Sequence, residues 1–153
     1  MIDVRILARD EAHALERVAD DVFDGPVHLD AARTYVADPR FHLAVAIDAG
    51  VVVGMASGVH YHHPDKPAPQ LWIDEVGVAD SHHRRGLASR LLATLLERGR
   101  SLGCREAWVL TERENEAAMQ LYAKAGGEAS DCVMFTFSLH DAAGPDGDEP
   151  DRA

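Results

Sequence analysis

The chain has few cysteines and no long apolar run. Its two cysteines, Cys104 and Cys132, cannot form a disulfide framework, and we expect reduced, buried thiols in a cytoplasmic protein. No segment approaches the roughly 18 apolar residues that cross a bilayer, and the first ten residues lack the apolar core of a signal peptide. These absences argue against a secreted disulfide-rich protein and against a membrane partner.

Basic residues are also scarce. Fifteen lysines and arginines stand against 26 aspartates and glutamates, which gives a net charge of −11. This balance argues against a nucleic-acid partner and favours cationic partners or simple solubility. Residues 141–153 hold five acids and one arginine, a net −4, so −7 remains for residues 1–140. The glycine, proline and acid content of 141–153 predicts a disordered tail behind a single domain over residues 1–140.

Hydrophobic periodicity predicts an α/β protein. A first helix is expected between an Asp10 cap and Gly25-Pro26, and a second between an Asp30 cap and Asp38. The other expected elements are strands over residues 2–7, 41–47, 51–59, 71–78, 106–110 and 132–139, and helices over 87–101 and 115–125. The order β-α-α-β-β-β-α-β-α-β indicates a central, mixed and mostly antiparallel sheet flanked by helices, with the nearly continuous apolar strand 71–78 at its centre.

The most specific motif runs from Val76 to Ser89, where a strand passes through a short basic loop into a helix. A helix N-terminus presents free backbone N–H groups and carries about half a positive charge, and Arg84 and Arg85 add two full charges. The motif therefore predicts a ligand that carries phosphate. A solvated basic turn is the alternative.

A second motif narrows this ligand. The loop His83-Arg-Arg-Gly-Leu-Ala88, followed by Asn115-Glu-Ala-Ala-Met-Gln-Leu-Tyr122 and Gly126, resembles the GCN5-related N-acetyltransferase (GNAT) family over about residues 2–140. The resemblance implies the fold of that family, acetyl-CoA as co-substrate, no metal, and a small-molecule amine acceptor. The residues that it implies for acetyl-CoA are Val76, Gly77, Val78, His83, Arg84, Arg85, Gly86, Leu87, Ala88, Ser89, Asn115 and Ala118. His83 departs from the usual arginine or glutamine, which predicts a weaker or pH-dependent side-chain contact to phosphate around an intact backbone cradle.

Within this family the chain looks most like the aminoglycoside 3-N-acetyltransferases of type I. The similar parts are the acid Glu75 just before Val-Gly-Val, the His-Arg-Arg loop, and the Ala-Met-Gln-Leu-Tyr-Ala-Lys segment that ends at Lys124. The resemblance implies an aminoglycoside acceptor that is acetylated at its 3-amino group, with Glu75 beside the accepting amine.

Acetyl transfer to an amine needs a base and an acid. An amine with a pKa near 10 is mostly protonated at neutral pH, so Glu75 is the candidate that orients the ammonium and accepts its proton. Tyr122 is the candidate acid for the departing thiolate. Gly77 suits a close approach by the cofactor, and the backbone N–H of Val76 or Val78 is the expected oxyanion donor. The alternatives are an edge carboxylate at Glu75, a packed tyrosine at Tyr122, and a plain helix cap at Asn115.

The acceptor site is less defined by the sequence. Asp74 joins Glu75 there only if the strand bulges, while Asp24, Glu112 and His60 are further candidates to line a site for a cation. The loop with His60, His62, His63 and Asp65 gives only a weak metal signal, and it otherwise lines the acceptor cleft or forms a plain surface.

Three functions remain open at this point. The first is an acetyltransferase that acts on a small polyamine-like acceptor such as an aminoglycoside. The second is the same chemistry on a polyamine, an amino acid or a peptide N-terminus. The third is a CoA-binding sensor without turnover, which the presence of both Glu75 and Tyr122 disfavours. The sequence leaves a monomer or a homodimer open.

Overall fold

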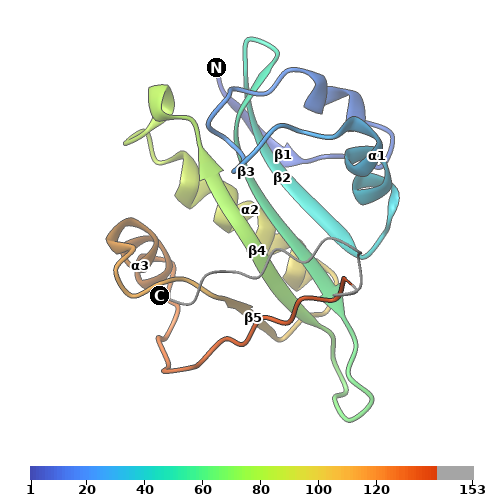
Figure 1. Cartoon of the computed structure of the whole chain (residues 1–153), viewed down its shortest axis with the longest axis vertical. Coiled ribbons are helices and arrows are strands. Elements are labelled where there is room, and N and C mark those ends of the chain that lie inside the picture. Colours follow the sequence, from blue (N-terminus) through green and yellow to red (C-terminus); the bar gives the residue numbers. More distant parts are fainter. Residues whose placement is uncertain (141–153) are drawn as a thin grey trace, which may run out of the picture.

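A five-stranded sheet forms the centre of the protein. The computed structural model describes residues 1–140, and the acidic tail expected over 141–153 lies outside the described residues. The strand order is β1 (Asp3–Ile6), β2 (Phe41–Asp48), β3 (Val51–Tyr61), β4 (Gln70–Val78) and β5 (Glu106–Val109). The first four strands are antiparallel neighbours, and β5 is parallel to β4 (Figure 1). The mixed, mostly antiparallel sheet predicted from the sequence is confirmed.

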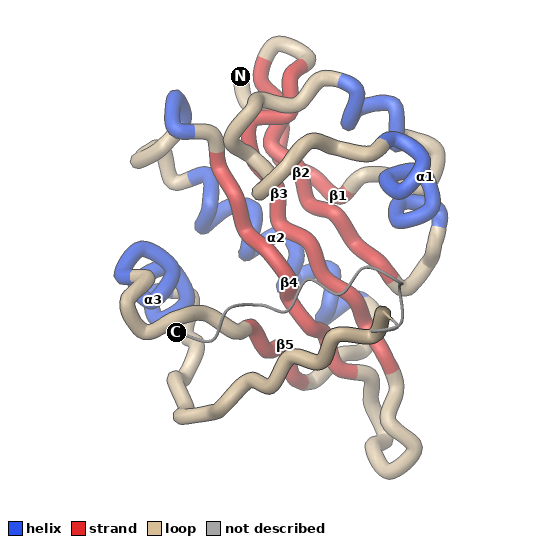
Figure 2. The backbone as a smooth tube through the Cα atoms, viewed as in Figure 1, coloured by secondary structure: helices blue, strands red, loops and turns tan. Residues whose placement is uncertain are grey.

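Helices cover both faces of this sheet. Helix α2 (Leu87–Ser101) contacts β1 to β4 from behind, whereas α1 (Leu29–Ala37) and the short 3-10 helix η1 (Ala12–Glu16) lie in front (Figure 2). A 3-10 turn, η2 (Asp80–His82), joins β4 to α2, and α3 (Glu116–Lys124) lies on the side of β5 (Figure 1). No helix in residues 1–140 has the length and apolar character that a membrane crossing requires.

The apolar stripe of α2 fixes that helix on the sheet. Leu87, Leu91, Leu92 and Leu95 are each at most 2% exposed. Their spacing of three and four residues places them on one side of the helix, as the sequence predicts. The helix has the predicted bounds. The loop before it is held between two rigid elements, the end of β4 and the start of α2.

The N-terminal region differs from the sequence prediction. The long helix expected after Asp10 is only η1, and residues 17–24, here called the crossing segment, run across the sheet instead. The Val52 N–H donates to the Arg17 carbonyl at 2.8 Å, and the Ala19 N–H donates to the Val52 carbonyl at 2.9 Å. These bonds replace helical ones, because the backbone pairs with β3. Helix α1 begins after a His28 cap rather than at Asp30, which lies in its first turn.

The C-terminal strand expected over residues 132–139 is not formed. The segment alternates apolar and polar residues, but the sheet ends at β5 and the segment has no strand partner within residues 1–140. Val133 and Phe135 are 80% and 78% exposed. The pattern that predicts a half-buried strand was present, whereas the burial that would stabilise it is missing. The expected buried thiols are also wrong, since Cys104 is half-buried and Cys132 is exposed in this segment, although both are free.

The crossing segment approaches β4 most closely at Gly77. A Cβ atom placed on Gly77 would overlap the carbonyl oxygen of Val22, whose side chain is 2% exposed. The sequence predicts that the cofactor makes the close approach at Gly77. The structure corrects this, because the atom that needs the space belongs to the protein's own backbone.

Replacing Gly77 with alanine should therefore destabilise the fold. The added methyl group must displace the Val22 backbone, and overpacking of this kind costs about 1–3 kcal/mol. Chemical denaturation of the two proteins measures the difference in the free energy of unfolding. Gly25→Ala is the matched control, since no atom lies within 4 Å of a Cβ at that position. Equal stability of Gly77→Ala and the parent protein would contradict this packing.

Candidate active site

The loop between β4 and α2 leads directly into the N-terminus of a helix. Arg84 and Gly86 have left-handed backbone conformations, with φ of 57° and 71°. Helix α2 begins after Gly86 without a side-chain cap, so the N–H groups of its first turn stay free for a ligand. Left-handed residues that alternate with right-handed ones, next to a helix N-terminus, create an anion-binding site. A left-handed arginine costs about 1–2 kcal/mol, and such strain is typical of ligand-binding loops.

Side chains from other elements hold this loop in place. The Asp80 N–H donates to a carboxylate oxygen of Asp21 at 2.7 Å. His82 Nε2 lies 3.0 Å from a carboxylate oxygen of Asp48, the last residue of β2, and the His82 side chain is only 14% exposed. His83 Nε2 lies 2.7 Å from the Val78 carbonyl oxygen, to which it can donate. The His83 side chain was expected at a phosphate, but this side chain folds back onto the end of β4.

A hollow of about 300 Å³ lies between the loop and α3. On the loop side it is lined by these residues of the sequence prediction: Val78, His83, Arg84, Gly86, Leu87, Ala88 and Ser89. On the other side it is lined by Ala117, Gln120, Leu121 and Lys124, none of which was predicted. Their spacing of three and four residues places them on one face of α3, but this local pattern does not show that the face meets the loop. Together with Arg84, Lys124 supplies positive charge to the hollow.

Five residues that were predicted to contact the cofactor do not line this hollow: Val76, Gly77, Arg85, Asn115 and Ala118. Asn115 caps α3, since its side-chain oxygen accepts a hydrogen bond from the Ala118 N–H at 3.1 Å. The plain cap that the sequence left open is thus present. Val76 is half-buried against the core.

The second half of β4 has a free edge. β4 pairs with β5 only from Gln70 to Ile73, whereas it pairs with β3 as far as Val78. Beyond Ile73 the edge of β4 that faces β5 has no strand partner within residues 1–140. This edge leads directly to the loop, so an extended ligand could lie along it.

Glu75 lies at a bulge in this strand. Ser57 pairs with Glu75 and Gly58 pairs with Ile73, so Asp74 has no partner on β3. From the sequence, Asp74 was expected to join Glu75 at the acceptor site only if the strand bulges. Burial raises the pKa of the half-buried Glu75, and the charges of Asp24 and Asp74 raise it further, against a hydrogen bond from the Asp24 amide. The structure therefore gathers three acidic groups, and Glu75 is a stronger base than an ordinary glutamate.

Tyr35 borders this acidic group from α1. Its hydroxyl lies 3.3 Å from the carbonyl oxygens of His42 and Gly58. Burial, followed by the charge of Asp74, raises the pKa of Tyr35 to about 12. The tyrosine therefore stays protonated and neutral, and the carboxylates remain the charged groups of this region.

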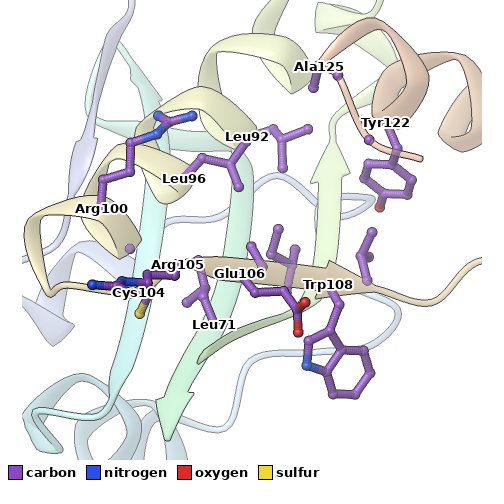
Figure 3. A pocket seen from close by; sticks show the side chains of 16 residues that line it. Leu71, Leu92, Leu96, Arg100, Cys104, Arg105, Glu106, Trp108, Tyr122 and Ala125 are labelled. Atoms are coloured by element: carbon purple, nitrogen blue, oxygen red, sulfur yellow. The ribbon is translucent and has the colours of Figure 1, made fainter. Parts of the chain in front are cut away.

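Tyr122 lines a different cavity. This cavity of about 280 Å³ has an apolar wall that includes Leu71, Leu92 and Leu96, and it extends along β5 to Trp108. Figure 3 shows the Tyr122 ring directed from α3 toward the strands. Burial raises the pKa of Tyr122, which keeps its hydroxyl protonated as an acid would require. Glu75 does not line this cavity.

The match to a protein-family model decides the family. The model described as Acetyltransferase (GNAT) family matches residues 9–127. The chain belongs to the GNAT acetyltransferase family. As a GNAT protein it is an acyltransferase with the fold that the sequence predicts.

Its relatives include aminoglycoside-modifying enzymes. Aminoglycoside N(6')-acetyltransferase type 1 from Salmonella typhimurium is 29% identical over 99 residues, which are 61% of this chain and 68% of the relative. An uncharacterized N-acetyltransferase from Mycobacterium tuberculosis is 26% identical over 136 residues, covering 88% and 82% of the two chains. The solved structure of aminoglycoside N-acetyltransferase AAC(6')-Iy in complex with CoA has the same fold, with a TM-score of 0.74, 21% identity and coverage of 92% and 96%. These named enzymes are of the N(6') type, so they give no support to the resemblance to the 3-N branch.

Two expected acceptor residues lie apart from the acidic group of this GNAT protein. Glu112 is exposed in the loop after β5. His60 Nδ1 lies 2.8 Å from Nε2 of His42 on the neighbouring strand, so His60 has a structural partner. The His60 loop belongs to no group of three potential metal ligands within the described part of the chain.

His42 should make the stability of this GNAT domain depend on pH. Burial, followed by the charges of Arg98 and His60, lowers the pKa of His42 from 6.5 to about 4. Between about pH 4 and pH 6.5, His42 is protonated in the unfolded chain and neutral in the folded chain. His42 therefore favours folding fully above about pH 6.5, and this contribution is lost as the pH falls to about 4.

Denaturation of the parent protein and of His42→Gln across this pH range measures the effect. The free energy of unfolding of the parent should fall more steeply, by an extra slope of at most about 1.4 kcal/mol per pH unit. His63→Gln, which removes an exposed histidine, is the control and should follow the parent. Parallel curves for His42→Gln and the parent would show that His42 is not held neutral.

Proposed function

We propose that this protein transfers the acetyl group of acetyl-CoA to a primary amine of a small polycationic acceptor, with an aminoglycoside as the leading case. The observation that carries the proposal is the arrangement along β4. An anion-binding loop follows the strand, and a carboxylate with a raised pKa lies on it. The chain thus offers sites of opposite charge to an anionic donor and a cationic acceptor.

The loop residues fit the diphosphate of a coenzyme A thioester. The backbone is left-handed at Arg84 and Gly86, the start of α2 has no side-chain cap, and Arg84 and Lys124 border the same hollow. Acetyl-CoA would supply an activated acetyl group on a good leaving group. Arg84 and residues 86–89 would hold its diphosphate, and the free edge of β4 beyond Ile73 would accept its extended arm. The Val76 or Val78 N–H remains the proposed donor to the oxygen on which negative charge develops.

Glu75 would act on the acceptor amine. Asp24 and Asp74 attract an ammonium group, and their charges help to raise the pKa of Glu75. A carboxylate of raised pKa takes a proton from the bound ammonium more readily, directly or through a water molecule. The neutral amine is then the nucleophile. Tyr122 would donate a proton to the departing thiolate from the side of the cofactor opposite Glu75.

The position of acetylation has two candidates. The Glu75 and Tyr122 motifs resemble the 3-N branch, whereas the relative from Salmonella and the solved structure with CoA are N(6') enzymes. A different amine, such as a polyamine, an amino acid or a peptide N-terminus, would need the same loop and the same base. A non-catalytic CoA sensor would need the loop alone, and it is disfavoured because the chain carries both a candidate base, Glu75, and a candidate acid, Tyr122.

Replacing Glu75 with glutamine tests the role of the base. The change keeps the shape of the side chain and removes the group that accepts the proton, so kcat at neutral pH should fall by about 10²–10⁴-fold. The affinity for acetyl-CoA should change little, because Glu75 does not line the hollow beside the loop. Thiol release from acetyl-CoA with an aminoglycoside, together with calorimetric CoA binding, measures both. Glu112→Gln is the control for loss of an exposed carboxylate, and unchanged turnover of Glu75→Gln would exclude Glu75 as the base.

Replacing Tyr122 with phenylalanine tests the role of the acid. The ring keeps its place in the apolar wall while the proton donor is lost, so kcat should fall by about 10²-fold with little change in stability. Tyr61→Phe removes another partly exposed tyrosine hydroxyl and is the matched control. A near-normal rate for Tyr122→Phe would assign protonation of the thiolate to water.

A further inference from the structure

The crossing segment touches both halves of the proposed site. At one end a carboxylate oxygen of Asp21 accepts the Asp80 N–H at 2.7 Å, where the phosphate-binding loop begins. At the other end, Asp24 lies against Glu75 through its amide and its charge. Between them the Val22 backbone is seated on Gly77. Four residues of one segment therefore span the distance from the loop to the base.

We propose that Asp21 is a positioning residue, which ties the phosphate-binding loop to Glu75 through the crossing segment, so that CoA binding at the loop alters the environment of Glu75. The inference rests on the proposed function for the role of Glu75. It does not need turnover for its test. Glu75 could act as a base and Tyr122 as an acid without such a link.

The packing explains how a contact at Asp80 can reach Glu75. The Val22 side chain is 2% exposed, and its carbonyl fills the space that Gly77 leaves, so the middle of the segment cannot shift freely. Its start is fixed as well, because Arg17 and Ala19 hydrogen-bond with β3. The segment is therefore a rigid connection between Asp80 and Glu75, and a displacement of the loop at Asp80 strains the segment as a whole, including Asp24, rather than being absorbed by slack backbone.

The link would connect the donor site at the loop with the acceptor site at Glu75. In the proposed function the loop binds an anion, while Asp24, Asp74 and Glu75 form the negative region for a cation. If the loop tightens on CoA, the segment sets the distance from Asp24 to Glu75. The base then reaches its working arrangement only when the acetyl donor is in place.

The first test measures CoA binding by titration calorimetry. Asp21→Ala removes the acceptor for the Asp80 N–H and should weaken CoA binding by about 3- to 10-fold. Asp21→Asn keeps a side-chain oxygen and should recover most of the affinity. Asp20→Ala removes the same charge from the neighbouring exposed residue and should bind CoA like the parent. Equal affinities of Asp21→Ala and Asp20→Ala would overturn the proposal.

The second test follows the Glu75 carboxyl by ¹³C NMR during pH titration, with and without saturating CoA. The direct field of CoA is the same in every saturated variant. A contribution through the segment is lost only when Asp21 is changed. The CoA-induced change in the pKa of Glu75 should therefore be smaller in Asp21→Ala than in the parent and in Asp20→Ala. An identical change in all three proteins would overturn the link.

The two tests separate this inference from the proposed function. If the parent transfers no acetyl group to any amine, the proposed function fails, yet CoA binding and the Glu75 titration still report on the link. If transfer occurs but Asp21→Ala behaves like Asp20→Ala in both measurements, the link fails and the proposed function stands.

Discussion

One-sided pairing of β4 is the constraint on which the site depends. The strand pairs with β3 as far as Val78 but with β5 only as far as Ile73. Continuous pairing on both sides would leave no room for an extended ligand beside the strand. Pairing on neither side would leave the strand too mobile to hold Glu75 and the loop at fixed positions. Pairing with β3 keeps the strand rigid, and the edge without a partner beyond Ile73 leaves room for a ligand.

Basic side chains gather beyond the end of β4, and acidic side chains gather around Glu75 within it. The folded chain is acidic, but Arg84 and Lys124 gather at the hollow where α2 begins, and Asp24 and Asp74 gather around Glu75. The proposed anionic donor and cationic acceptor would thus be attracted to neighbouring places. The two histidines of the loop contact the protein's own atoms instead, since His82 lies against Asp48 and His83 against the Val78 carbonyl oxygen. Their contacts shape the loop, and its backbone is left to bind the ligand.

Much of this could be predicted from the sequence, because it depends on local patterns. The leucine stripe of α2, the glycine at the start of that helix and the Asn115 cap are set by residues within one or two turns. Contacts between distant segments could not be predicted. Gly77 was expected to face the cofactor and instead faces Val22, and Lys124 was missed because nothing local places α3 beside the loop. The segment 132–139 shows the converse, since a clear strand pattern forms no strand where the sheet offers no burial.

The most direct measurement of the central claim is mass spectrometry of the product after the full chain is incubated with acetyl-CoA and a panel of amines. The panel contains an aminoglycoside, a linear polyamine, an amino acid and a peptide with a free N-terminus. The account predicts one acetyl group on a polycationic acceptor, and fragmentation of the product then shows which amino group carries it. Tight CoA binding without acetyl transfer to any amine in the panel would contradict the account.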